Sequence, residues 1–200
     1  MTTSRPLAFA ALALAATLTV SACSSNEKPT ADPTNASESP SPVAESSAAT
    51  VPSGWQPVDL DGSAEISVPP DWTVKSTGDA LDTLRAPDDA VGFPPGSATV
   101  GVGNLAGGDQ KEGLEWMANR QLKTNYAGYT NLKRLPDEVI NGTKFYRLQA
   151  ENGADWYDVY GTVTPDGEYS IVLEWKFLKS LDRKQAEAIW SPVMPTFKML

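Results

Sequence analysis

The chain has 200 residues with 25 acidic and 16 basic side chains, a formal net charge of −9 that argues against nucleic acid as a partner. It has no histidine and one cysteine, which excludes serine–histidine triads, cysteine–histidine dyads and histidine-ligated metals. We therefore expect a protein that is not an enzyme and has neither a metal site nor a cofactor.

Residues 1–22 have the pattern of a secretory signal peptide. Arg5 supplies the positive start, and an apolar run from Leu7 to Val20 follows it. This run is shorter than the roughly 20 residues that a membrane-spanning helix needs. The next residues complete the quartet Val-Ser-Ala-Cys, which resembles the bacterial lipobox. We expect cleavage after residue 22 and a diacylglyceryl anchor on Cys23, which places the chain on the extracytoplasmic face of the cell membrane. The alternative is an ordinary secretory signal with an incidental cysteine.

A polar segment separates this cysteine from the rest of the chain. Residues 24–53 are mostly Ser, Thr, Ala, Pro, Asp and Glu, without any aromatic residue. Such a composition cannot bury enough apolar surface to offset the entropy of ordering. We therefore predict that residues 23–53 form a lipidated, disordered tether, about 30 Å long as a coil.

The folded domain is predicted to span residues 54–200, which hold all six tryptophans and all six tyrosines. Turn sequences divide it into short runs, several of which alternate between apolar and polar residues. Asn-Gly and Asp-Gly dipeptides between such runs indicate antiparallel hairpins. The predicted turns are Asp61-Gly62, Asn141-Gly142, Asn152-Gly153 and Pro165-Asp166-Gly167.

Two segments have helical periodicity instead. The first is predicted to begin at Asp109, with Glu112 completing a capping box, and to end at Gly128. Its apolar stripe consists of Leu114, Met117, Ala118, Gln121 and Leu122, and Trp116 lies off this stripe. The second is predicted to begin at Ser180 and to end before Pro192 and Pro195. Its apolar face consists of Leu181, Ala188 and Ile189. The order strands, helix, strands, helix predicts an α+β fold with helices packed on an antiparallel sheet.

The glycine cluster before the first helix has a relaxed form of the dinucleotide-binding fingerprint, Gly101-x-Gly103-x-x-Ala106. That fingerprint needs a parallel β-α-β unit and an acidic residue about 20 positions further on. Residues 121–123 hold no carboxylate, and the surrounding runs predict antiparallel hairpins. We therefore interpret the glycines as a flexible turn between a strand and a capped helix, and we expect no nucleotide ligand.

Carboxylates are the remaining source of catalytic chemistry. A spaced pair of acids would suit a hydrolase of wall polysaccharide. The candidates are Asp88, Asp89, Asp137, Glu138 and Asp158, but acids in turns are usually solvated and no nucleophile–base pair can be named. An acid-pair hydrolase therefore stays a minor alternative.

Two neighbouring runs combine aromatic and charged residues on one face. Alternation places Trp156, Asp158 and Tyr160 together, and it gives Phe145, Arg147 and Gln149 a similar face on the preceding strand. Aromatic rings beside polar groups can stack on sugars or line a slot with a polar mouth. We predict that Phe145, Arg147, Trp156 and Tyr160 contact a ligand or partner. The alternative is a face half-covered by the second helix or a loop.

The motif Val68-Pro69-Pro70-Asp71-Trp72 resembles the opening of PsbP-like domains. The run ATVGVGNL before a helix, Asn141-Gly142 before FYRL, and EYSIVLEWKF before AEAIWSPVMPTF fit the same group. With the lipobox and the tether, the chain resembles the LpqN/LpqT lipoproteins of mycobacteria and related actinobacteria. The doubled proline, Pro192 and Pro195, departs from that pattern and is expected to shorten the last helix.

This resemblance implies an α/β/α sandwich with a central antiparallel sheet. It also implies a non-catalytic binding domain for an envelope glycolipid or an envelope transport protein. A purely protein-docking accessory subunit without a small ligand is the alternative. The family has no active-site residues to transfer, so Cys23 is the one functional position that the resemblance supplies.

Overall fold

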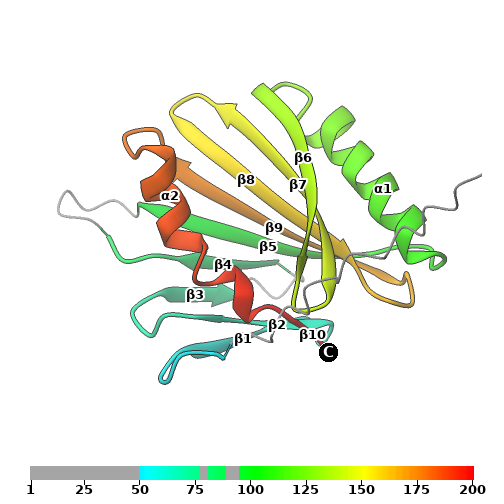
Figure 1. The fold of residues 1–200 in the computed structure, drawn as a ribbon, viewed down its shortest axis with the longest axis horizontal. Helices are drawn as coiled ribbons and strands as arrows, with labels where there is room; N and C mark the ends of the chain where they lie inside the picture. Colours follow the sequence, from blue (N-terminus) through cyan, green and yellow to red (C-terminus); the bar gives the residue numbers. More distant parts are fainter. Residues whose placement is uncertain (1–49, 77–80, 89–94) are drawn as a thin grey trace, which may run out of the picture. The chain divides into compact units, whose positions relative to one another are not determined.

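The structure is a computed structural model that describes residues 50–76, 81–88 and 95–200 (Figure 1). The predicted signal peptide, Cys23 and the tether up to residue 49 lie outside the described residues, and so does Asp89. Among the residues described, no helix is long and apolar enough to span a membrane.

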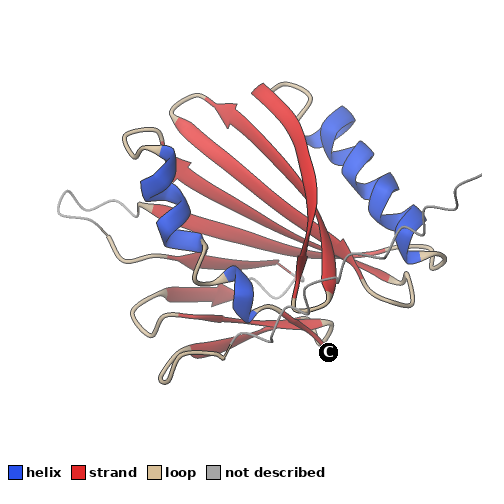
Figure 2. Ribbon diagram, in the orientation of Figure 1, coloured by secondary structure: helices blue, strands red, loops and turns tan. Residues whose placement is uncertain are grey.

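A seven-stranded antiparallel sheet forms the centre of the domain (Figure 2). Its strands lie in the order β3, β4, β5, β9, β8, β7 and β6. Their bounds are β3 Thr73–Ser76, β4 Leu81–Arg85, β5 Gly96–Asn104, β9 Tyr169–Leu178, β8 Asp155–Val163, β7 Thr143–Asn152 and β6 Thr130–Ile140. A second, three-stranded sheet combines β1 Gln56–Leu60, β2 Ala64–Val68 and β10 Lys198–Met199, with β2 in the middle.

The predicted turns join neighbouring antiparallel strands. Asp61 and Gly62 have φ angles of 54° and 68°, and Asn141 and Gly142 have 47° and 78°. Positive φ at both central residues suits the twist of the two-residue hairpin at Asn141-Gly142, whereas the β1–β2 loop has a third residue, Ser63, because Leu60 pairs with Ala64. One turn differs by a residue: Asn152 still belongs to β7 and pairs with Asp155, so the β7–β8 turn is Gly153-Ala154.

The first helix, α1, spans Gln110–Arg120 and continues into a wide π-type turn at Gln121–Asn125. Asp109 caps it as predicted, because its carboxylate accepts a hydrogen bond of 2.9 Å from the Glu112 backbone N–H. The preceding glycines differ from the prediction, since Gly101 and Gly103 lie inside β5. The turn is confined to residues 105–108, where Gly107 and Gly108 have positive φ.

The second helix, α2, spans Arg183–Trp190 and is followed by a short 3₁₀ helix at Met194–Thr196. Its predicted start at Ser180 is wrong, because Asp182 caps it and forms a reciprocal capping box with Gln185. This start also changes which face is buried. Ala186 and Trp190 face the core and Ile189 is half-buried, whereas the predicted Ala188 is exposed. The helix ends before Pro192, as expected.

The two sides of the large sheet bury two separate apolar clusters. One side, covered by α2, the 3₁₀ helix and the small sheet, buries Tyr160, Trp190, Phe145, Phe197 and the β9 residues Ile171, Leu173, Trp175 and Phe177. The other side, covered by α1, buries Leu114, Met117, Ala118, Tyr146, Leu148, Tyr157 and Val159. In Figure 1, α2 crosses in front of the sheet. The α+β fold with helices packed on an antiparallel sheet is therefore confirmed.

The C-terminal segment fastens the small sheet to the domain. The Thr196 hydroxyl accepts from the Ser67 backbone N–H at 2.9 Å and lies 3.0 Å from the Ser67 carbonyl. The Asn141 side-chain amide, in the β6–β7 turn, donates to the Phe197 carbonyl at 3.0 Å. Residues separated by more than 50 positions are thus joined through the last few residues of the chain.

Candidate binding groove

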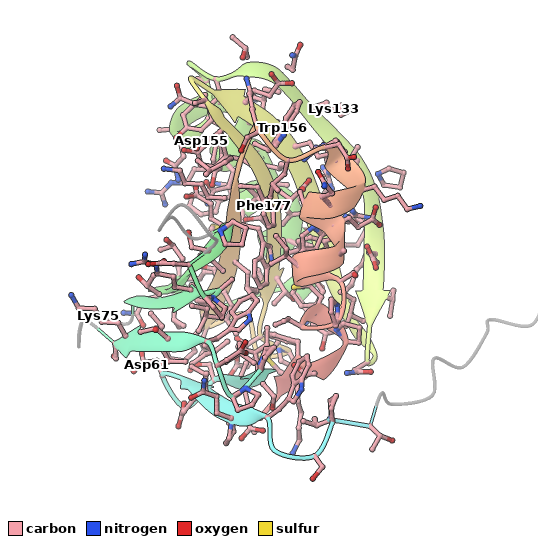
Figure 3. The ribbon with its side chains drawn as sticks, turned by 90° about the vertical axis from the view of Figure 1, so that its left-hand side faces the viewer. Asp61, Lys75, Lys133, Asp155, Trp156 and Phe177 are labelled. Carbon is pink, nitrogen blue, oxygen red and sulfur yellow. The ribbon has the colours of Figure 1, made fainter. Side chains whose placement is uncertain are left out.

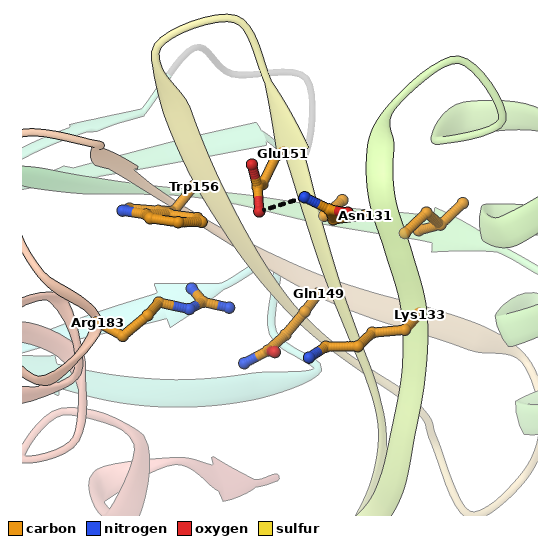
Figure 4. Close-up of a pocket in the computed structure, with 8 residues that line it drawn as sticks. Asn131, Lys133, Gln149, Glu151, Trp156 and Arg183 are labelled. Atoms are coloured by element: carbon orange, nitrogen blue, oxygen red, sulfur yellow. Dashed lines mark hydrogen bonds between the residues drawn. The ribbon is translucent and has the colours of Figure 1, made fainter.

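A groove of about 460 Å³ opens on the α2 side of the large sheet. Figure 3 places two of its residues, Trp156 and Lys133, at the end of the domain away from Asp61 in the β1–β2 turn. Strands β6, β7 and β8 and the start of α2 form its walls. Its lining consists of Asn131, Leu132, Lys133, Gln149, Ala150, Glu151, Trp156 and Arg183 (Figure 4).

Trp156 is the aromatic residue of this groove. Its indole N–H donates to the Leu181 carbonyl at 3.2 Å, which anchors one edge of the ring. Two cations contact the ring: the Arg183 guanidinium lies 5.0 Å from its centre and the Lys179 ammonium lies 5.3 Å away. Figure 4 shows the Arg183 guanidinium close to the ring. These contacts are within cation–π range and hold the half-buried ring in a defined orientation.

Arg183 also reaches beneath the groove to Asp158 of β8. Its guanidinium nitrogens lie 3.0 and 3.4 Å from the two carboxylate oxygens. Asp158 is only 4% exposed, and its burial raises the pKa of this carboxyl above the usual value of 3.8, against the opposite effect of Arg183. One arginine therefore positions the tryptophan ring and neutralises a buried carboxylate.

The opposite wall carries groups that donate and accept hydrogen bonds. The Glu151 carboxylate accepts from the Asn131 amide at 2.8 Å and pairs with Lys179 at 2.7 Å, which lowers its pKa. Lys133 lies opposite Gln149 in the β6–β7 pairing, and Figure 4 shows both side chains extending into the groove. Asn131 has a φ of 50° beside a β-bulge. Such local strain re-aims side chains and clusters at functional sites.

A smaller pocket of about 110 Å³ adjoins the groove, because Gln149 and Arg183 line both spaces. The rest of its lining is Arg147, Asp158, Glu187 and Trp190. Arg147 lies over the Tyr160 ring, 4.8 Å from the ring centre, and pairs with Glu138 at 2.7 Å.

The structure separates the four residues predicted from the sequence to bind. Trp156 lines the groove and Arg147 lines the adjoining pocket. Phe145 and Tyr160 are 0% and 1% exposed, so they differ from the prediction and belong to the core. Phe145 packs edge-on against Phe197 at 5.0 Å, and Tyr160 packs against Trp190 at 5.2 Å. Both side chains belong to the apolar cluster on the α2 side of the large sheet.

The groove also contains residues that the sequence did not single out for binding: Asn131, Lys133, Glu151 and Arg183. Lys133 is opposite Gln149 only because β6 has a bulge between Leu135 and Glu138. Arg183 belongs to the site because α2 begins at Asp182 and not at Ser180. The detectable signal was the capping pair Asp182-x-x-Gln185, which sets the start of the helix.

A second groove of about 410 Å³ lies at the start of α1 and includes the glycine turn. Trp116, 52% exposed, forms one wall, and Leu105, Gly107, Gly108 and Gly113 contribute to the others. Strand β5, which leads into this turn, pairs antiparallel with both β4 and β9. The glycines therefore lack the parallel β-α-β unit that the dinucleotide fingerprint requires.

The candidate acids within the described ranges are paired with cations. Asp88 pairs with Arg85, Asp137 with Arg134 and Lys144, Glu138 with Arg147, and Asp158 with Arg183. In the same part of the chain, no group of three or more acidic, histidine or cysteine side chains is placed to hold a metal ion.

Comparison with known proteins gives remote structural likenesses. No family model matches the chain, and no curated protein matches it. LpqN of Mycobacterium tuberculosis, described as involved in cell envelope biogenesis, is similar over 72% of this chain and 90% of its own, with 15% identity and a TM-score of 0.48. A protein from Bacteroides thetaiotaomicron is similar over 68% of this chain, with 12% identity and a TM-score of 0.43. The similar region spans 45% of the length of the Bacteroides protein. Likenesses this distant assign no function.

Proposed function

We propose that this protein is a lipoprotein anchored to the cell membrane through Cys23, whose domain binds the head group of an envelope glycolipid without chemical conversion. The lipobox-like quartet ending at Cys23 and the polar segment of residues 24–53 support the anchor and the extracytoplasmic location. The tether would let the domain reach ligands in the envelope layer next to the membrane.

The observation that carries the binding role is the position of Trp156 in a groove walled by hydrogen-bonding side chains. A sugar has apolar C–H faces and polar hydroxyl edges. An indole ring packs against the former, while amides such as Asn131 and Gln149 both donate to and accept from the latter. The two basic residues Lys133 and Arg183 and the acidic Glu151 add further donors and acceptors. A groove of this size suits one or two sugar units.

A non-catalytic role is part of the proposal. Catalysis by an acid pair needs two carboxylates that face one cleft and remain available for proton transfer. In the groove, Glu151 is held by Lys179 and Asn131, and below it Asp158 is held by Arg183. Both carboxylates are therefore engaged in structural contacts.

We also propose that the domain is a PsbP-like α/β/α sandwich of the LpqN/LpqT type. The motif that suggested this resemblance has a defined place here. Val68 ends β2, and Trp72 is buried edge-on against Trp175 of the central sheet, 6.1 Å between ring centres. Pro-x-x-Trp thus connects the small sheet to the large one, as an opening motif of the fold would.

The proposal is tested by isolating the full-length protein from the membranes of its host in mild detergent and recording native mass spectra. We expect retained glycolipid with wild type and with Trp116→Ala, and its loss with Trp156→Ala. Trp116→Ala is the matched control, because it removes an exposed tryptophan from the other groove. A wild-type protein that retains no lipid and does not bind envelope lipid extracts would refute the binding role.

The anchor has its own test. Replacing Cys23 with Ser removes the thiol that would carry the lipid. We expect the variant protein to be released into the medium, whereas wild type stays in the membrane fraction. Retention of the Cys23→Ser protein in the membrane would contradict the anchor and leave the binding role to be judged on the lipid measurement.

A second candidate function is docking of an envelope transport protein. It is favoured by the groove around Trp116, whose other walls are mostly small or apolar residues. Exposed tryptophans are frequent anchors of protein interfaces. Cross-linking of wild type and of Trp116→Ala in the host distinguishes this role, since only docking makes the cross-linked product depend on Trp116.

A further inference from the structure

The small pocket beside the groove is lined by hydrogen-bond donors and by hydrogen-bond acceptors. It measures about 110 Å³ and is lined by Arg147, Gln149, Asp158, Arg183, Glu187 and Trp190. Arg183 forms the boundary with the main groove, since its guanidinium contacts both the Trp156 ring and the Asp158 carboxylate. A ligand seated at Trp156 is therefore one side chain away from this pocket.

Two donors among these residues have no acceptor. Within the described residues, the Trp190 indole N–H and the Arg147 Nε–H are buried and make no hydrogen bond. Trp190 is only 8% exposed. An unpaired buried donor costs about 1–3 kcal/mol, and such groups are rare in native proteins. Neither donor atom is accessible to a water molecule, so an acceptor in the pocket removes part of that cost once a small side-chain shift exposes the donor.

The same pocket also presents acceptors. Asp158 binds Arg183 through its two oxygens, but a carboxylate has about four acceptor positions, so part of its capacity remains. Glu187 of α2 contributes a second carboxylate. Two carboxylates beside two arginines, Arg147 and Arg183, give the lining no net charge.

We propose that this pocket is a subsite for a neutral primary hydroxyl group, the hydroxymethyl arm of a sugar bound at Trp156; the inference rests on the proposed function. A hydroxyl group both accepts and donates, so it complements the indole and guanidinium donors and the carboxylate acceptors together. A carboxylate or phosphate would add an uncompensated negative charge to a lining whose charges already balance, and a methyl group would leave the Trp190 and Arg147 donors without an acceptor.

The volume of the pocket admits the hydroxymethyl arm of a sugar but not its pyranose ring. At roughly 30 Å³ for each water-sized group, about 110 Å³ admits three or four such groups. A hydroxymethyl arm fits within that volume, whereas a substituted pyranose ring does not. The ring therefore stays in the larger groove, beside Trp156 and the amide side chains.

The test compares three probes that differ only at this arm: octyl glucoside, octyl 6-deoxyglucoside and octyl glucuronide, each below its micelle concentration. Dissociation constants are measured calorimetrically on the mature chain, residues 23–200, carrying Cys23→Ser. We expect the glucoside to bind about tenfold more tightly than the other two, as one hydrogen-bonded hydroxyl provides. Equal affinities for all three probes would overturn the subsite and leave the groove intact.

Two variants assign the selectivity to this pocket. Trp190→Phe keeps an aromatic ring, although a smaller one, and removes the N–H, so we expect the preference for glucoside over 6-deoxyglucoside to fall to within about threefold. Glu187→Gln removes one repelling charge, so we expect tighter binding of the glucuronide alone. An unchanged preference in Trp190→Phe, or unchanged glucuronide binding in Glu187→Gln, would contradict the assignment.

Different results would refute the sugar-binding groove and the hydroxymethyl subsite. Trp156→Ala should abolish binding of all three probes, because it removes the surface on which the ring rests. If wild type binds none of the probes, the sugar-binding function itself is refuted. If wild type binds all of them through Trp156 without discriminating at the arm, only the subsite is refuted.

Discussion

Arg183, the first residue of α2, lies 3.0 Å from the carboxylate of Asp158 in β8, which is almost completely buried. Because removal of one partner leaves the other charge buried and unpaired, we expect Arg183→Met to lower the free energy of unfolding by about 1–3 kcal/mol. Urea denaturation measures this change. The double variant Arg183→Met with Asp158→Asn should recover most of the loss, and an equally unstable double variant would show that the contact is not the cause.

The same carboxylate predicts a pH dependence. Burial raises the pKa of Asp158, so the folded protein binds its proton at a higher pH than the unfolded chain does. The contribution of Asp158 to stability therefore decreases as the pH rises from the unfolded value, 3.8, through the raised folded value. We expect the stability of wild type minus that of Asp158→Asn to fall across this interval. A difference that rises with pH would show that Arg183 outweighs burial.

Gly161 of β8 has no room for a side chain. It pairs with Tyr146 of β7, and an added Cβ would lie only 2.0 Å from the tip of that tyrosine ring. We expect Gly161→Ala to lower stability by about 1–3 kcal/mol or more, seen as a clear drop in Tm. Gly128→Ala is the control, because nothing lies within 4 Å of its added Cβ. A Gly161→Ala protein as stable as this control would contradict the packing.

An ion-pair cluster joins α1 to β6. Arg134 makes two bonds of 2.6 Å to the carboxylate of Glu115 and a third of 3.1 Å to Asp137. Glu115 is 46% exposed, so we expect Glu115→Gln to cost less than about 1 kcal/mol, and less still in 1 M salt. Hydrogen bonding to Arg134 lowers the pKa of Glu115, so this contribution is lost as the pH falls through the lowered value. A salt-independent loss would point to packing instead.

The sequence predicted the hairpin turns and the two faces of β8 well, because residues close together in the chain determine both. Positive φ at Asn141 and Gly142 needs these residue types, and alternation in β8 places Tyr157 and Tyr160 on opposite sides of the sheet. The π-type turn after α1 and the strand β10 have no comparable local signal. The strand consists of two residues, and its pairing with β2 depends on tertiary contacts alone.

The groove was only partly predictable, for a geometric reason. Regular antiparallel pairing of β6 with β7, counted from the Asn141-Gly142 turn, would place Arg134 opposite Gln149. In such pairing each residue of β6 has one partner in β7. The bulge between Leu135 and Glu138 shifts the pairing by one residue, so Lys133 takes that place and Arg134 pairs with Leu148. A one-residue shift exchanges the two faces of a strand. Trp156 and Arg147 were accessible to pattern analysis, and the Asp182-x-x-Gln185 capping pair could have placed Arg183, whereas the neighbours from β6 were not accessible.

The pairing of β10 with β2 bears on when the domain is able to fold. Met199 pairs with Ala64, and the Leu200 N–H donates to the Ser63 carbonyl, so the two partners are about 135 residues apart in the chain. The small sheet therefore stays open until residues 198–200 reach residues 63–65, so its closure depends on a contact between segments far apart in the sequence and not on a local hairpin.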